Sequence, residues 1–409
     1  MKHFFRRGTA GLSALVAAAA AVTLPVVTAT PAAAATGYVL VGISGDSINT
    51  LSLGGGYTLS PPFSPHTHDY VVRCNSGTNQ IPLQLGADPA ETMTVGTNQQ
   101  PSTVSGNAVT VTVAAVPNEA VVLYAPDAST GVTSQYWIRC LPPDFPALAV
   151  NPAGTASAEW SPGYYLTGNL TARNNGTHYA MILNGNGTPV WYQAGPNNGI
   201  YNLEVLPNGN LAWAAAAAGT TAYASFNLAT QTLSQLPAAI PNTDEHDLFP
   251  LPNGDRMMLS SVVTSGHDLS TLGPGFATLF GPQTADSSQA QGNVVDCVAE
   301  EVNSQNQAVW TWDANQHIGL DEINTATGSP DQGPPWILAG GPAADIYHCN
   351  SIGVDEDPSS PTYGDVLVSM RHTNAVYLID RQSGNVVWKL GGTALTASDP
   401  EEQQATPAV

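Results

Sequence analysis

Histidine, asparagine and arginine occur together in the C-terminal part of the chain. His348 and Asn350 lie in the stretch Tyr-His-Cys-Asn-Ser-Ile, and Arg371 and His372 follow the strand-like run Val-Leu-Val-Ser-Met. Guanidinium and imidazole groups donate hydrogen bonds to anions, and a sheet can hold such side chains at the ends of its strands. The sequence therefore predicts an anion site built from these four residues.

Cations are otherwise scarce. The chain has 10 Lys and Arg against 31 Asp and Glu, a formal net charge of −21. Three of the cations, Lys2, Arg6 and Arg7, fall in a predicted export signal, so the mature chain carries a charge of about −24. So acidic a surface repels phosphate backbones, and we expect no nucleic-acid partner. Because cations are so scarce, an arginine beside histidines in this chain indicates a site for an anion.

Short strands and tight turns must position these residues. Gly (39) and Pro (32) are abundant, charged residues are only 10% of the chain, and no useful amphipathic helical period is present. Leu206-Pro-Asn-Gly-Asn210 and Leu251-Pro-Asn-Gly-Asp255 are predicted hairpin turns, because Pro presets φ and Asn-Gly tolerates the positive φ that comes after it. Composition and turns together predict an all-β protein.

The turns recur within a larger repeat. A polar turn followed by a strand with a tryptophan occurs at Trp191, Trp310 and Trp388. Units with a period of about 40–45 residues are typical of a β-propeller. We expect a partial propeller over residues 150–392 and an irregular tail over 393–409. The four expected units are 150–195, 198–240, 244–313 and 345–390.

The N-terminus has the pattern of a signal peptide over residues 1–35. A basic start is followed by the apolar run Leu12 to Val27 and by small residues before position 36. Arg6 and Arg7 also allow twin-arginine export in place of the general secretory route. We expect a secreted or extracytoplasmic protein without a membrane span, since no other long apolar run occurs.

Residues 37–145 form a predicted domain of their own. Runs such as Tyr70-Val-Val-Arg73 and Ala108-Val-Thr-Val-Thr-Val113 alternate with turn residues at the spacing of a β-sandwich. The segment resembles the cadherin-like sandwich modules of secreted bacterial proteins. A stiff proline-rich stretch, Leu141 to Pro146, then links it to the repeat region.

Four cysteines are present, which in an exported protein favours disulfides. The sequence alone allows three pairings. We expect Cys74–Cys140 and Cys297–Cys349, because the members of each pair fall in the same predicted domain. No C-x-x-C spacing supports a metal site.

Several phrases in residues 150–392 together resemble the bacterial arylsulfate sulfotransferase family. They are Glu245-His-Asp-Leu-Phe-Pro-Leu-Pro-Asn-Gly254, Tyr347-His-Cys-Asn-Ser-Ile352, Ser369-Met-Arg-His-Thr-Asn374 and the segment Asp380 to Gly392. The resemblance implies an exported six-bladed propeller without a cofactor. It also implies transfer of a sulfuryl group from a phenolic sulfate ester to a phenol, through a sulfated histidine and without a nucleotide sulfate donor.

The resemblance also assigns roles to residues. It implies that His246, His348 and Arg371 are catalytic and that Asn350 binds substrate, and we expect His372 to bind substrate as well. A sulfuryl transition state spreads negative charge over three oxygens, so Arg and imidazolium donors would lower the barrier. A neutral imidazole can accept the group near pH 7, and a second histidine can protonate the leaving phenolate.

One departure limits the resemblance. The family's acceptor histidine resembles a Gln-His-Asp-Ala phrase after the Trp-x-Leu-Gly-Gly strand, whereas no histidine follows His372 in this sequence. The expectation is a family member truncated at its C-terminus, with about four of six blades. If transfer chemistry survives the truncation, His372 is the first candidate for a substitute acceptor. The alternatives are an inactive propeller that binds sulfated or phenolic ligands, and a surface adhesion module. The oligomeric state is left open.

Overall fold

The computed structural model contains strands, turns and three short 3₁₀ helices in the part of the chain that it describes. The fold is all-β, as predicted. The described residues are 38–44, 48–87, 94–96, 102–105, 107–126, 133–148, 163–169, 177–195, 199–217, 220–272, 291–323, 336–338 and 341–392. The predicted signal peptide and tail lie outside them. No helix among the described residues is long and apolar enough to cross a membrane.

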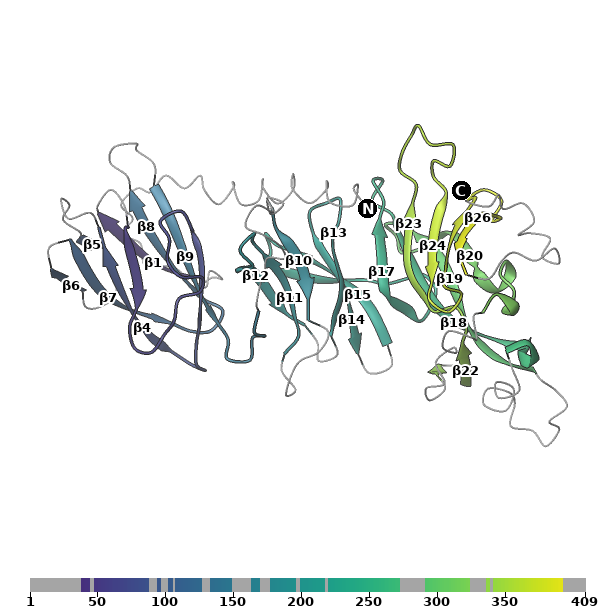
Figure 1. Cartoon of the computed structure of the whole chain (residues 1–409), viewed down its shortest axis with the longest axis horizontal. Helices are drawn as coiled ribbons and strands as arrows, with labels where there is room; N and C mark the ends of the chain where they lie inside the picture. The colour runs from purple at the N-terminus through teal and green to yellow at the C-terminus, as the bar shows by residue number, and fades with distance from the viewer. Residues whose placement is uncertain are drawn as a thin grey trace. The chain divides into compact units, whose positions relative to one another are not determined.

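The chain divides into two compact units, Met1–Ala194 and Gly195–Val409. Two sheets of the first unit lie within residues 38–141 (Figure 1). One has the order β3-β9-β8-β1-β5, with β1 Tyr38–Ser44, β3 Asp69–Arg73, β5 Thr94–Gly96, β8 Ala120–Pro126 and β9 Thr133–Leu141. The other has the order β2-β4-β7-β6, with β2 Thr50–Leu53, β4 Asn79–Gly86, β6 Ser102–Ser105 and β7 Ala108–Ala115.

The buried faces of these two sheets share one core. Side chains alternate between buried and exposed along β4 and β7, the period of two that a sheet with one covered face requires. Ile81 and Val111 from one sheet and Val121 and Ile138 from the other belong to the same hydrophobic cluster. The Cys74–Cys140 disulfide lies in that cluster as well.

A third sheet of the first unit contains β10 Tyr165–Gly168, β11 Tyr179–Leu183 and β12 Pro189–Ala194. Its Tyr179 and Met181 pack on Val71, Leu141 and Phe145. This sheet falls in the first of the four expected propeller units, although it belongs to the compact unit of the N-terminal domain.

The described residues of the second unit form three sheets, one for each of the other expected propeller units. The first has β13 Ile200–Val205, β14 Leu211–Ala217, β15 Thr220–Asn227 and β16 Thr232–Leu236 in sequential order. The second has the order β17-β18-β19-β22-β21, with β20 also on β19. Its strands are β17 Thr243–Pro250, β18 Arg256–Asp268, β19 Gln291–Val302, β20 Ala308–Asp313, β21 Trp336–Leu338 and β22 Gly341–Asp345.

The third sheet contains β23 Cys349–Val354, β24 Val366–Met370, β25 Ala375–Ile379 and β26 Val386–Gly391 in sequential order. The short helices are η2 Leu269–Leu272, η3 Ala314–Gln316 and η4 Leu320–Glu322. Both Pro-Asn-Gly turns form as predicted, with Gly209 at φ +80° and Gly254 at φ +92°. Each turn closes a hairpin. The second strand after Gly209 is β14, which begins with buried apolar residues, and the second strand after Gly254 is β18, in which the buried Met257, Met258 and Leu259 follow Arg256.

One hydrophobic cluster joins the last two sheets. Leu259 and Ala299 from the sheet of β17–β19 and Ile352 and Val368 from the sheet of β23–β26 are all members. Because the two sheets share this core, the loops and strand ends between them have fixed positions relative to one another. The predicted site residues lie along this junction.

Candidate active site

The turn between β22 and β23 carries His348. The residue has φ +51°, a left-handed conformation that is uncommon outside glycine and is often found at functional sites. The buried ring of Tyr347 anchors the turn, because its hydroxyl donates a 2.7 Å hydrogen bond to the carbonyl of Ile318. The fold therefore fixes the direction in which the His348 side chain leaves the backbone.

The β24–β25 hairpin turn lies directly against this turn. Its Arg371 N–H donates to the carbonyl of His348 at 2.9 Å, and its His372 N–H donates to the carbonyl of Tyr347 at 3.2 Å. The hydrogen bonds bring Arg371 Nη1 to 3.5 Å from His348 Nε2. Two segments far apart in sequence thus place a guanidinium beside an imidazole, as an anion site requires.

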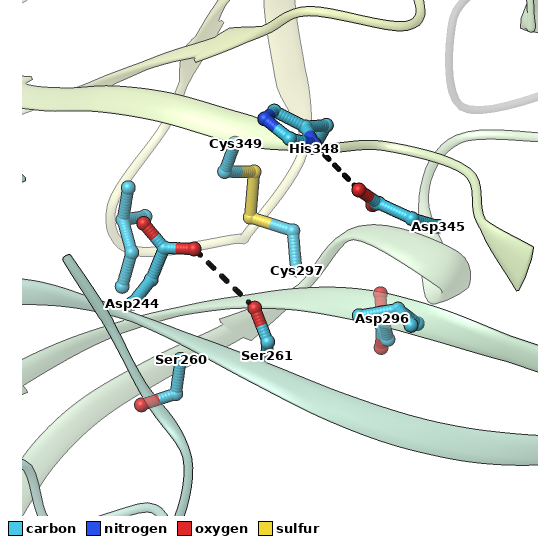
Figure 2. Close-up of a pocket in the computed structure, with 10 residues that line it drawn as sticks. Asp244, Ser260, Ser261, Asp296, Cys297, Asp345, His348 and Cys349 are labelled. Carbon is cyan, nitrogen blue, oxygen red and sulfur yellow. Dashed lines mark hydrogen bonds and ion pairs between the residues drawn. A yellow bond between two sulfur atoms is a disulfide. The ribbon is translucent and has the colours of Figure 1, made fainter. Parts of the chain in front are cut away.

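Asp345 fixes the other side of the His348 ring. Its Oδ2 lies 2.5 Å from His348 Nδ1, and Asp345 is 6% exposed. Figure 2 shows this contact as a dashed line, with His348 above the Cys297–Cys349 disulfide and Asp345 to its right. Since an ionised carboxylate can only accept, Nδ1 carries the proton and Nε2 faces Arg371.

The ring of His372 is held by the same aspartate through a different atom. His372 Nδ1 lies 2.8 Å from the main-chain oxygen of Asp345, and the His348 and His372 ring centroids are 5.0 Å apart. Burial lowers the pKa of His372, which is 6% exposed. This imidazole is therefore neutral near pH 7.

The third imidazole comes from β17. The ladder between β17 and β18 shifts register between Thr243 and Leu248, which frees the intervening residues from regular pairing. Asp244 Oδ1 accepts from the His246 N–H at 2.9 Å and from the ring Nδ1 at 2.6 Å. The hydrogen bond to Asp244 raises the pKa of His246. Its ring centroid lies 5.2 Å from that of His348, at an interplanar angle of 65°.

A small cavity lies behind these rings. Its volume is about 10 Å³, room for about one water molecule, and it is lined by Asp244, Asp296, Asp345, His348 and the disulfide. Figure 2 shows Asp244 and Asp296 on separate strands. The Asp244 carboxylate accepts a hydrogen bond from the Ser261 hydroxyl. The cavity is too small for a sulfate ester, so a substrate must approach the outer faces of the imidazoles.

Two more carboxyl groups with raised pKa values lie near the site, Asp296 buried and Asp247 partly buried. Burial raises the pKa of Asp296 to about 7; this residue is 2% exposed and its Oδ1 accepts from the Asn315 N–H at 3.0 Å. Burial also raises the pKa of Asp247 to about 6, and its Oδ2 accepts from the Ile352 N–H at 2.9 Å. Asp247 thereby ties β17, which carries His246, to β23, which begins directly after His348.

Asn350 is half-buried in β23, where the ladder to β24 shifts register between Cys349 and Ser351. Within the described part of the chain, its side chain makes no hydrogen bond to the other site residues. The structure thus brings together four of the five predicted site residues, His246, His348, Arg371 and His372. The fifth lies two residues from His348.

Asp345, His348 and His372 also place one potential metal ligand each within 4.8 Å of one another. However, Asp345 Oδ2 is already at hydrogen-bond distance from His348 Nδ1, and a guanidinium faces the other nitrogen of that ring. Zinc ligands need open lone pairs at about 2.0–2.1 Å from the ion. The arrangement of charges suits an anion better than a cation.

Sequence reasoning missed the two aspartates that orient the histidines. Asp244 precedes His246 by two residues and Asp345 precedes His348 by three, and both spacings are visible in the sequence. Neither spacing is diagnostic by itself, because an aspartate near a histidine in a turn has many other partners. The contacts became evident only from the bulge in β17 and the turn after β22.

The sequence model of the Arylsulfotransferase (ASST) family matches residues 150–403. This chain belongs to the arylsulfotransferase family. The resemblance that the sequence phrases indicated is therefore confirmed. The match contains every predicted site residue and both aspartates.

Comparison with other proteins adds little to this. No curated protein matches the chain. A Synechocystis apocarotenoid oxygenase mutant is 10% identical with a TM-score of 0.26, over 55% of this chain and 44% of its own. A protein from Lactobacillus plantarum is 11% identical with a TM-score of 0.22, over 78% of this chain and 83% of its own. The Dos1 propeller is 12% identical with a TM-score of 0.23, over 85% of this chain and 62% of its own.

This chain thus spans less than half the length of the apocarotenoid oxygenase. TM-scores this low carry no argument about fold or function. The assignment to the arylsulfotransferase family rests on the sequence match, and the chemistry of the site rests on its geometry.

Proposed function

We propose that this arylsulfotransferase moves a sulfuryl group from a phenolic sulfate ester to a phenol at the cluster of His246, His348, Arg371 and His372. The observation that carries the proposal is the geometry of the cluster, in which the His348 ring centroid lies 5.2 Å from that of His246 and 5.0 Å from that of His372. The directions of two pKa shifts agree with it. Asp244 raises the pKa of His246, whereas burial lowers the pKa of His372. Groups whose pKa values are pushed apart in one site are suited to acid and base roles.

In the first half-reaction, the lone pair on His372 Nε2 attacks sulfur as the ester S–O bond breaks. His246, protonated beside Asp244, gives its proton to the leaving phenolate oxygen. Arg371 faces the sulfuryl oxygens and stabilises their charge, and the Asn350 amide donates a further hydrogen bond. His348 Nε2, 3.5 Å from Arg371 Nη1, holds the guanidinium in place. In the second half-reaction, neutral His246 takes the proton of the acceptor phenol. The phenol oxygen attacks sulfur and displaces His372 Nε2, which regains its lone pair. No cofactor is required by this scheme.

The architecture belongs to the same proposal. Residues 37–145 would form a cadherin-like sandwich module, and residues 150–392 a partial propeller whose blades are the sheets β10–β12, β13–β16, β17–β22 and β23–β26. The signal-like residues 1–35 would direct export. The disulfides Cys74–Cys140 and Cys297–Cys349 support an extracytoplasmic location, because such bonds persist in oxidising compartments.

A second function is favoured by one observation. Only 6% of His372 is exposed, which restricts access of a sulfuryl group to the ring. If the ring cannot be reached, the cluster is a binding site for sulfated or phenolic ligands without transfer chemistry.

The test is release of nitrophenol from 4-nitrophenyl sulfate by the purified chain, with and without added phenol. We expect release that depends on phenol and is lost in His246→Asn and Arg371→Ala. A control, His66→Asn in the N-terminal unit, should retain full activity. A folded chain that binds the ester but releases no nitrophenol would support the binding module and contradict the transferase.

A further inference from the structure

One aspartate contacts two of the three site histidines through two different groups. The Asp345 carboxylate lies 2.5 Å from His348 Nδ1, and its main-chain carbonyl oxygen lies 2.8 Å from His372 Nδ1. We infer that Asp345 is a positioning residue for sulfuryl transfer, setting the tautomer of both rings so that His372 presents Nε2 to the sulfuryl group and His348 presents Nε2 to Arg371. The inference deepens the proposed function and rests on it for its effect on rate.

The tautomers follow from what each partner can do. A main-chain carbonyl accepts hydrogen bonds and never donates them, so the proton of neutral His372 lies on Nδ1. An ionised carboxylate has the same restriction, so His348 also carries a proton on Nδ1. The Nε2 of neutral His372 is left with a lone pair. The Nε2 of His348 faces Arg371 Nη1 at 3.5 Å.

The two contacts differ in what holds them. Asp345 is the last residue of β22 and pairs in parallel register with Val295 of β19. It is 6% exposed. The position of its carbonyl is therefore set by the backbone and survives a change of side chain. The carboxylate contact depends on the side chain alone. A substitution at this position should release His348 and leave His372 in place.

Asparagine is the informative substitution. Its amide can accept from Nδ1–H or donate to a bare Nδ1, so it no longer selects between the tautomers of His348. The same change beneath the histidine of a serine protease keeps the geometry and lowers kcat about 10⁴-fold through the wrong tautomer. For Asp345→Asn we expect kcat to fall by at least about tenfold while KM for the donor changes little, since the loss is in orientation.

The deciding measurement is the nitrogen spectrum of histidine-labelled protein, with His348 and His372 assigned by single His→Gln variants. We expect both rings of the wild-type chain to be protonated at Nδ1. In Asp345→Asn, the His348 signals should change tautomer and those of His372 should not. The matched control is Asp365→Asn, because Asp365 accepts from the Arg381 N–H at 3.2 Å and, among the described residues, contacts no histidine. Its spectrum and activity should equal those of the wild type.

Two results would overturn the inference: a wild-type His348 or His372 protonated at Nε2 alone, or an unchanged His348 tautomer in Asp345→Asn. The wild-type spectrum decides the first point even if the variant fails to fold. The spectra do not depend on turnover, so an inactive wild-type chain with the expected tautomers would reject the proposed transferase and leave the positioning role of Asp345 standing.

Discussion

The imidazole rings of His246 and His348 lie 5.2 Å apart, edge to face at 65°, although His246 lies in β17 and His348 in the turn between β22 and β23. Each ring has its own aspartate on Nδ1, Asp244 at 2.6 Å and Asp345 at 2.5 Å. The pairing fixes the orientation of both rings. Arg371 and His372 complete the cluster from the adjoining hairpin turn.

The first prediction concerns Arg371. Arg371→Ala should weaken binding of 4-nitrophenyl sulfate about 10–100-fold, because a charge-assisted hydrogen bond contributes about 1.5–3 kcal/mol. Calorimetric titration measures this directly. Arg73→Ala is the control, since Arg73 donates to the main-chain oxygens of Phe145 and Pro143 in the other unit. Unchanged affinity in Arg371→Ala would show that Arg371 does not bind the anion.

The second prediction is a pH dependence set by Asp244. The hydrogen bond raises the pKa of His246 above its ordinary value of 6.5, so its acid form persists to higher pH. In Asp244→Asn, the alkaline limb of the kcat/KM profile for the donor should move to lower pH.

The same pair also makes stability depend on pH. Because the folded-state pKa of His246 is raised, its contribution to stability is full below 6.5 and is lost as pH rises through the folded pKa. Urea unfolding should therefore separate wild type from Asp244→Asn more at pH 6 than at pH 8. An alkaline limb at the same pH in both proteins would contradict the role given to His246.

Much of this site could be predicted from the sequence, because the signals that indicate it are local. His348, Asn350, Arg371 and His372 lie at strand ends, where the residue pattern itself indicates position, and the Pro-Asn-Gly turns have a backbone requirement that few other residues meet. The all-β class followed from the same turns and from the absence of helical periodicity.

The orienting aspartates and the burial of His372 were not predictable in this way. Asp244 reaches His246 only because β17 departs from its ladder, and register shifts leave no unique mark in a sequence. His372 looks like an exposed turn residue in sequence, but the β22–β23 turn covers it. The first feature depends on the register between β17 and β18, and the second on hydrogen bonds between the β22–β23 and β24–β25 turns.

The third prediction concerns the disulfide beside His348. Replacing Cys297 and Cys349 by Ala should lower the free energy of unfolding by about 2–4 kcal/mol through the loss of loop closure. It should also lower the transfer rate, because Cys349 follows His348 directly. Chemical denaturation and the nitrophenol assay measure the two effects. Removing Cys74–Cys140 serves as the comparison: it should cost similar stability in its own unit and leave the transfer rate unchanged.

The fourth prediction uses Asp296. Burial raises its folded-state pKa to about 7 from an ordinary value of 3.8. The folded state therefore binds the proton more tightly, and this stabilisation is full below pH 3.8 and is lost as pH rises to about 7. Asp296→Asn should reduce the fall in unfolding free energy between pH 4 and 7.5, by an amount on the order of 1–3 kcal/mol. Parallel curves for the two proteins would mean that Asp296 ionises normally.

The central claim is that the cluster moves a sulfuryl group between two phenols. Its most direct test is mass spectrometry of the products formed from 4-nitrophenyl sulfate and 1-naphthol. We predict naphthyl sulfate and nitrophenol in equal amounts with the wild-type chain, and neither with His348→Asn. Nitrophenol with free sulfate and no naphthyl sulfate would identify a hydrolase and contradict the claim. No product from a folded chain would mean that the cluster binds its ligand without transferring the sulfuryl group.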